Sequence, residues 1–184
     1  SNIGGPFLYF NESILYYHAN YPGGKGGYDI YYSTREGDGW SEPKPFEGLT
    51  NSRGDEFHPA VPPGLQKIYF SRGNPNADAR KPSRTPDCQT FYMASKNLSG
   101  EWIEPKPLHD AINRSCEYVL SLSEDGRTIY FSSVDQENHR DGYNIYYARE
   151  LESGAWFLPV LIEGIASDRT NYNARVVGDY IYYI

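Results

Sequence analysis

The sequence repeats the same pattern three times, and this repeat constrains the fold more than any other feature. Trp40, Trp102 and Trp156 are each followed three residues later by a proline. An alternating run rich in aromatic residues precedes each tryptophan: YDIYYST (28–34), QTFYMAS (89–95) and YNIYYAR (143–149). Internal periodicity of this kind is typical of repeat architectures.

Each repeat contains further alternating runs upstream. The nearest are ILYYHA (14–19), KIYFSR (67–72), TIYFSS (128–133) and YIYYI (180–184); their tyrosines Tyr16, Tyr69, Tyr130 and Tyr182 are spaced by 53, 61 and 52 residues. Ahead of these lie FLYF (7–10), DEFHPAV (55–61), CEYVLSL (116–122) and TNYNARV (170–176). With an outermost strand that begins at the tryptophan, each repeat holds four strands.

Four short strands in a repeat of about 50 residues are the pattern of a β-propeller blade. The sequence therefore predicts an all-β protein: a β-propeller of four-stranded antiparallel blades, with three blades and a partial fourth. The expected boundaries are about 5–50, 51–112, 113–166 and 167–184, within one segment spanning 1–184. A β-sandwich would leave the three Trp-x-x-Pro copies unexplained.

Composition and charge agree with this fold and exclude several functions. The 18 tyrosines suit half-buried pleated surfaces, and the 18 glycines and 13 prolines suit turns. A net charge of -7 argues against nucleic acid or an anionic membrane as the main partner. No run of residues is apolar enough to span a membrane, and no motif calls for a cofactor.

Several segments resemble a known family. DEFHPAVPPGLQKIYFSR, CEYVLSLSEDGRTIYFSS and GGKGGYDIYYSTREGDGWSEPKPF are similar to the TolB-like, WD-repeat-like β-propeller repeats of bacterial envelope proteins, above all the variant found beside OmpA-like domains. The resemblance implies a non-catalytic binding or scaffolding module in the periplasm or at the cell surface, associated with the outer membrane. Its partner would be a protein or a cell-wall-linked molecule. The second repeat departs from the family by a long insert, and the fourth stops after two strands.

A carbohydrate-active propeller, either a glycoside hydrolase or a lectin, is the alternative. The hairpins STREGDGW (33–40), SKNLSGEW (95–102) and RELESGAW (149–156) have nearly the spacing of the sialidase Asp box. However, Arg35, Asn97 and Leu151 replace its aspartate. In either case the tyrosines and tryptophans are expected to pack between blades, with Trp102 in such a seam.

Propeller topology gathers polar residues at one end of the inner strands. They are Asp55, Glu56, His58, Glu117, Asn171 and Asn173. Glu56 and His58, two residues apart, should face the central channel together as solvated groups. Ligands of a metal or a pair of glycosidase acids are the alternatives, but too few groups converge to assign a metal or a catalytic residue.

The insert RGNPNADARKPSRTPDC (72–88) is the most individual segment. It carries Arg72, Arg80, Lys81 and Arg84 on an acidic protein, and long loops on rigid scaffolds often bind partners. A solvated insertion without function is the other interpretation. Cys88 and Cys116 come to the same face of neighbouring blades, so a disulfide between them is predicted, with two free thiols as the alternative.

Three and a half blades do not close a ring, because propellers typically have about 4–8 blades. The sequence therefore predicts an open arc, completed by the rest of a longer chain or by another chain. The family resemblance implies six blades.

Overall fold

The protein was analysed as a computed structural model that describes residues 1–9, 11–46, 48, 50–73, 89–114, 116–134, 143–165 and 173–184. Within these ranges the regular structure is β-strand, apart from one 3-10 turn, η1 (Glu163–Ile165). Every pair of neighbouring strands is antiparallel. The all-β prediction is therefore confirmed.

The strands group into four units that follow the repeat. The first unit is β1 (Ile3–Leu8), β2 (Ile14–Ala19), β3 (Asp29–Glu36), β4 (Gly39–Trp40) and β5 (Lys44–Pro45). The second is β6 (Glu56–Ala60), β7 (Lys67–Gly73), β8 (Gln89–Ser95) and β9 (Lys106–Pro107). The third is β10 (Glu117–Leu122), β11 (Thr128–Val134), β12 (Tyr143–Arg149) and β13 (Val160–Leu161), and the fourth is β14 (Arg175–Val177) with β15 (Tyr180–Tyr182).

In each complete unit, the third strand pairs with the outermost strand at the equivalent residue. Tyr31 lies opposite Pro45 in the first unit, and Tyr92 lies opposite Pro107 in the second. In the third unit Tyr146 lies opposite Leu161. The repeat seen in the sequence is thus a repeat of backbone pairing.

The outermost strand differs from the prediction that it begins at the tryptophan. Trp40, Trp102 and Trp156 each pair with the third strand near its end, but the ladder then stops and resumes four residues later. The Trp-x-x-Pro proline lies in this gap, and a proline has no N–H to donate to a ladder. The edge is therefore broken into two short pieces.

The innermost strands also differ in detail from their predicted bounds. Of the expected FLYF strand (7–10), Phe7 and Leu8 belong to β1, which begins at Ile3, and Tyr9 follows its end. Of the TNYNARV segment (170–176), only Arg175 and Val176 belong to β14; Asn173 and Ala174 precede it, and 170–172 lie outside the described residues. In β1, β6 and β10 the register shifts at a bulge: between Gly4 and Phe7, between Phe57 and Ala60, and between Tyr118 and Leu120. A bulge breaks the strict alternation on which the sequence prediction relied.

Apolar seams join neighbouring units. Tyr16 and Ile30 of the first unit pack against Ile68 and Phe70 of the second. Tyr69 and Phe91 of the second unit pack in the same way against Ile129 and Phe131 of the third. Burial of this apolar surface is the main source of stability, since one unit cannot cover both its faces.

Two of the three repeated tryptophans pack against the preceding unit at a seam. The Trp102 ring lies 5.0 Å from the Phe46 ring of the first unit, and the Trp156 ring lies 6.0 Å from the Tyr69 ring of the second. The predicted place of Trp102 in a seam is therefore confirmed. Trp40, in the first unit, is 38% exposed.

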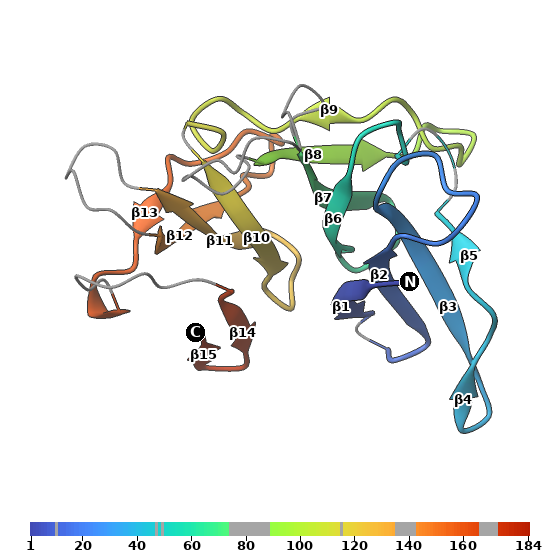
Figure 1. The fold of residues 1–184 in the computed structure, drawn as a ribbon. Coiled ribbons are helices and arrows are strands. Elements are labelled where there is room, and N and C mark those ends of the chain that lie inside the picture. The colour runs from blue at the N-terminus through green and yellow to red at the C-terminus, as the bar shows by residue number, and fades with distance from the viewer. Residues whose placement is uncertain are drawn as a thin grey trace, which may run out of the picture.

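The units form an open arc (Figure 1). The first unit lies at one end of the arc, and β14 and β15 lie at the other. β1, β6, β10 and β14 lie on the inner side of the arc. A single backbone pairing, Glu117 with Gln89, joins the second and third units into one curled sheet. Within the described residues β14 and β15 pair only with each other, so the sheets do not close.

Candidate functional site

A cavity of about 1030 Å³ lies at the centre of the arc. The innermost strand of each unit contributes to its wall: β1, β6, β10 and β14, with Leu15 of β2 in addition. β1 contacts β6, β6 contacts β10, and β10 contacts β14, so these strands surround the cavity in chain order. The cavity is therefore a product of the whole arc and of no single unit.

Each unit brings one residue with a left-handed backbone to the cavity wall, from its innermost strand or, for Asn173, from just before that strand. Gly5, His58, Val119 and Asn173 have φ values of 54°, 50°, 47° and 60°. A left-handed conformation is unusual for a non-glycine residue and is strained for a β-branched one such as Val119. Residues with strained backbones cluster at binding and active sites, so their recurrence here marks the cavity as the candidate site.

His58 lines the site, and its imidazole packs against that of His18. The imidazole ring centroids of His18 and His58 lie 5.2 Å apart, edge to face. The backbone N–H of His58 donates a hydrogen bond to His18 Nδ1 at 3.3 Å. Gly4 and Gly5 make room for His18, because a Cβ on either would lie 2.7 Å from an imidazole nitrogen. The His18 ring thus rests directly on the backbone of β1.

Both histidines are neutral at physiological pH. Burial lowers the pKa of His18 to about 4. Burial also lowers the pKa of His58 to about 3, and the neighbouring His18 and Arg175 add to this effect. A neutral imidazole can accept or donate a hydrogen bond, which is the chemistry that His58 offers at the cavity wall.

Tyr118 and Arg175 line the cavity as well. The Tyr118 ring lies 5.5 Å from the His58 ring and 5.7 Å from that of Tyr143. Arg175 donates a hydrogen bond to the carbonyl oxygen of Pro6, which joins the fourth unit to the first across the cavity. Burial lowers the pKa of its guanidinium. The cavity thus combines an aromatic ring, the neutral imidazole of His58 and a cation.

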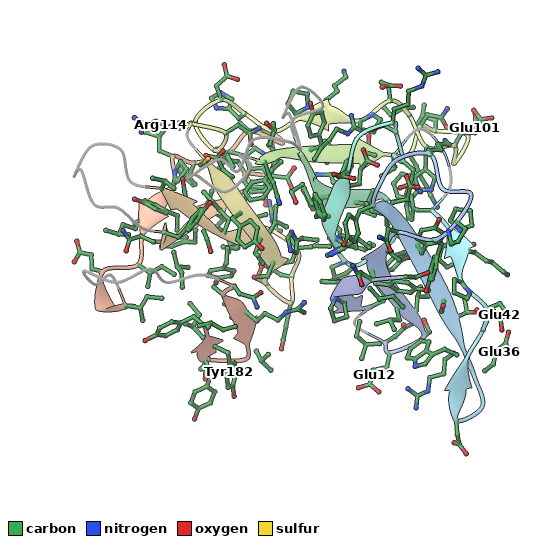
Figure 2. The ribbon with its side chains drawn as sticks, in the orientation of Figure 1. Glu12, Glu36, Glu42, Glu101, Arg114 and Tyr182 are labelled. Carbon is green, nitrogen blue, oxygen red and sulfur yellow. The ribbon has the colours of Figure 1, made fainter. Side chains whose placement is uncertain are left out.

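Two carboxylates line the cavity among the described residues, Glu12 and Glu124. Both are exposed and lie in the turns that follow β1 and β10. Figure 2 shows Glu12 at the lower edge of the first unit. A glycosidase acid needs a raised pKa, which burial normally supplies, so these exposed groups do not by themselves make an acid pair.

Glu56 is not the solvated channel residue that the sequence suggested. It is fully buried and accepts hydrogen bonds from the Ser52 N–H at 3.0 Å, the Ser52 hydroxyl at 2.5 Å and Arg72 Nε at 2.9 Å. Burial raises the pKa of its carboxyl, while Ser52 and the charge of Arg72 oppose the rise. The left-handed backbone at His58 breaks the alternation, so His58 lines the cavity and Glu56 does not.

Asp55 and Glu117 also have structural contacts. Asp55 Oδ1 accepts a hydrogen bond from the Tyr28 N–H at 2.8 Å and so links the second unit to the first. Glu117, which occupies the place of Glu56 in the third unit, is 2% exposed and lies 3.5 Å from the Ser133 hydroxyl. Neither lines the cavity. Asn173 does line it, and Asn171 lies outside the described residues.

The basic loop is described only at its start. Arg72 pairs with Glu56, donates to the Thr50 carbonyl at 2.9 Å and lies over the Tyr92 ring at 4.6 Å, so its guanidinium is held inside the fold. Arg80, Lys81, Arg84 and Cys88 lie outside the described residues. Cys116 is buried and is held in a disulfide. Its predicted pairing with Cys88 stays a prediction.

Sequence reasoning missed a pair of asparagines that repeat across units. Asn51 accepts from the Ile30 N–H at 2.7 Å and donates to the Ile30 carbonyl at 2.9 Å. Asn113 does the same for Phe91 at 2.9 Å and 3.1 Å. Their signal was an asparagine a few residues ahead of each inner strand. Arg175 and Tyr118 were missed because nothing in the sequence distinguishes them from neighbouring residues.

The described residues contain no group of three or more histidine, cysteine, aspartate or glutamate side chains placed to hold a metal ion. No helix in the same part of the chain has the length and apolar character needed to cross a bilayer.

Comparisons with known proteins give a likeness of fold. No family model matches the sequence, and no curated protein matches it either. A solved structure described as "Glycoside hydrolase" is similar, with a TM-score of 0.52 and 14% sequence identity. The match covers 94% of this chain and 61% of that chain, so this chain spans less than two thirds of that structure's length. At this identity the match shows a shared fold alone.

Proposed function

We propose that the chain is part of a β-propeller that binds carbohydrate at the centre of its arc. The observation that carries this proposal is the central cavity, to which every unit contributes one inner strand. Repeated four-stranded units around a shared axis are the propeller arrangement. The likeness to a glycoside hydrolase supports a carbohydrate ligand in such a cavity.

The side chains of the cavity suit a sugar. Tyr118 offers an aromatic ring, while His58, Asn173 and Arg175 offer donors and acceptors for hydroxyl groups. Ligand sites typically combine apolar walls with a few placed polar groups. Because Glu12 and Glu124 are exposed, the described residues favour binding over hydrolysis.

Affinity electrophoresis through gels that contain different polysaccharides tests this proposal. At least one polysaccharide should retard the chain, and Tyr118→Ala should weaken that retardation by about tenfold through loss of stacking. Arg175→Gln should weaken it as well, whereas Arg53→Gln, an exposed arginine outside the cavity, should not. Equal retardation of all variants, or no retardation in any gel, would exclude carbohydrate binding at this cavity.

A non-catalytic scaffold of the cell envelope is the second candidate, and one surface favours it. The outer edge of the third unit is apolar: Phe157, Leu158 and Val160 are 57%, 70% and 46% exposed. The second unit has Glu104 and Lys106 at the positions of Leu158 and Val160. Sheet edges usually carry charges that prevent association, so an apolar edge favours a protein partner.

Introducing the charges of the second unit at the edge of the third unit tests the scaffold candidate. Leu158→Glu with Val160→Lys should abolish capture of one defined protein from a periplasmic or outer-membrane extract and leave the thermal melt unchanged. Leu98→Glu is the matched control, because Leu98 is fully exposed on a turn elsewhere. Loss of capture in the control as well would point to general stickiness, and unchanged capture in the double variant would refute binding at this edge.

A further inference from the structure

A second cavity, of about 770 Å³, lies on the first unit. Side chains alternate along β3, so Ile30 enters the seam with the second unit and Tyr31 lies on the opposite face. The cavity opens on that opposite face. Its wall includes Tyr21, Lys25, Asp29, Tyr31 and Glu42.

The glycine-rich segment GGKGG (23–27) wraps the Asp29 carboxylate. The N–H groups of Lys25 and Gly26 donate to Asp29 Oδ2 at 2.6 Å and 3.3 Å. A Cβ at Gly24 would lie 2.2 Å from the same oxygen, so the loop can approach only as glycine. This glycine-rich segment therefore builds a site around the Asp29 carboxylate.

The other oxygen of Asp29 has no donor in the part of the chain that the structure describes. Asp29 is 2% exposed, and Oδ1 is buried without a hydrogen-bond partner among the described residues. Buried polar atoms are nearly always paired, and an unpaired one calls for an explanation such as an absent ligand. The second and third units have Thr90 and Asn144 at this position, so the charge belongs to the first unit alone.

Aromatic rings and a second carboxylate complete the cavity. The rings of Tyr21 and Tyr31 meet edge to face with their centroids 4.8 Å apart. Burial, first of all, raises the pKa of the Tyr21 phenol to about 12, and the charge of the nearby Glu42 contributes to the rise. Figure 2 shows Glu42 on the outer side of the first unit, beside β5.

We propose that this cavity binds an organic ammonium group, carried by an amino sugar or by a lysine side chain. Carboxylates form their strongest hydrogen bonds with charged donors, and tyrosine faces attract cations. Asp29 Oδ1 and Glu42 would accept the N–H donors, while Tyr21 and Tyr31 would pack against the adjoining carbons. Lys25, at the wall, places a competing positive charge there.

Calorimetric titration of the 184-residue chain with three probes tests the proposal. Glucosamine and Nα-acetyl-lysine amide should bind, and glucose should bind at least about tenfold more weakly, since it lacks the charge. The tighter of the two ammonium probes identifies the source of the group. Binding of glucose as tight as that of glucosamine, or no binding of either ammonium probe, would overturn the proposal.

Variants locate the binding. Glu42→Gln should weaken ammonium binding by about fivefold, as expected for a partly exposed ion pair. Glu104→Gln, the same change at the equivalent place in the second unit, should have no effect. Lys25→Met should strengthen binding, because it removes the competing charge. Equal effects of Glu42→Gln and Glu104→Gln would place the ligand elsewhere.

Asp29→Asn keeps the shape of the carboxylate and removes its charge, so it should abolish measurable binding; thermal melting shows whether this variant folds. The site is separate from the central cavity. Tyr118→Ala should therefore leave ammonium binding intact, and failure of carbohydrate binding at the central cavity would not affect this proposal.

Discussion

Single residues set the chemistry of the central cavity through their neighbours. The His18 ring packs on two glycines of β1. Its centroid lies 5.6 Å from that of the Tyr28 ring and 5.2 Å from that of the Phe57 ring. This enclosure removes water from the imidazole and disfavours its charged form. The same residue in a loop would titrate normally, so its neutrality follows from packing.

Acid should destabilise the protein through His18. Its pKa is lowered to about 4 in the folded state, so between pH 6.5 and pH 4 the unfolded state binds more protons and stability falls as pH falls. On the order of 2 kcal/mol should be lost from this group. Urea unfolding at several pH values should show a flatter pH dependence for His18→Gln than for the wild type.

His109→Gln is the control, because His109 is exposed. If both variants kept the pH dependence of the wild type, burial of His18 would not be the cause.

The repeated asparagines make a second prediction at this scale. Asn113 bonds the Phe91 N–H, the Phe91 carbonyl and, at 3.0 Å, the Leu108 carbonyl. Asn113→Ala should lower the free energy of unfolding by about 1–3 kcal/mol, because buried backbone groups lose their partners. Asn113→Asp keeps the acceptor but loses the donors, so its free energy of unfolding should lie between those of the wild type and Asn113→Ala. Denaturant titration measures all three values.

At the scale of elements, stability depends on how one unit covers the next. The edge strands are short and interrupted by proline, so their own pairing contributes little. The tryptophan ahead of each proline instead covers the preceding unit where one exists. Gly48 shows how close this contact is, since a Cβ there would lie 2.7 Å from Trp102 Cβ.

Trp102 and Trp40 should therefore differ although they occupy equivalent positions. Trp102→Ala removes a ring that packs on Phe46 and should cost about 2–4 kcal/mol. Trp40→Ala removes a ring that contacts Arg35 at the surface and should cost under about 1 kcal/mol. Thermal melts of both variants measure the difference, and equal losses would contradict the role of the seam.

At the scale of the whole molecule, two side-chain hydrogen bonds among the described residues join the fourth unit to the others. The Ser121 hydroxyl donates to the Ala174 carbonyl at 2.7 Å, and Arg175 donates to the Pro6 carbonyl. No backbone pairing joins β14 and β15 to the other described strands. The shape of the central cavity therefore depends on a few side-chain contacts.

Arg175→Ala should loosen the fourth unit selectively. Loss of one charged hydrogen bond is worth about 1.5–3 kcal/mol, and only β14 and β15 depend on it. Hydrogen exchange should become faster in these two strands and stay unchanged in β10, β11 and β12. Uniformly faster exchange throughout the chain would show instead that Arg175 supports the entire fold.

The sequence by itself determined the middle strands of each unit, the grouping of the strands and the seams, but not the bounds of the innermost and outermost strands. Alternation in YDIYYST and its copies fixed which residues face a neighbouring unit, because a strand has a period of two and apolar faces must be buried. The recurring Trp-x-x-Pro fixed the repeat length. These features are local, so they could be read without coordinates.

Only the tertiary structure decided the sites. The bulge at His58 turned Glu56 away from the cavity, and Arg72 came to bind Glu56 within the fold instead of serving the basic loop. Asp29, a strand residue in the sequence, became the centre of a carboxylate site through the loop that wraps it. Such outcomes depend on small backbone rotations and on contacts between units, which no local pattern of residues encodes.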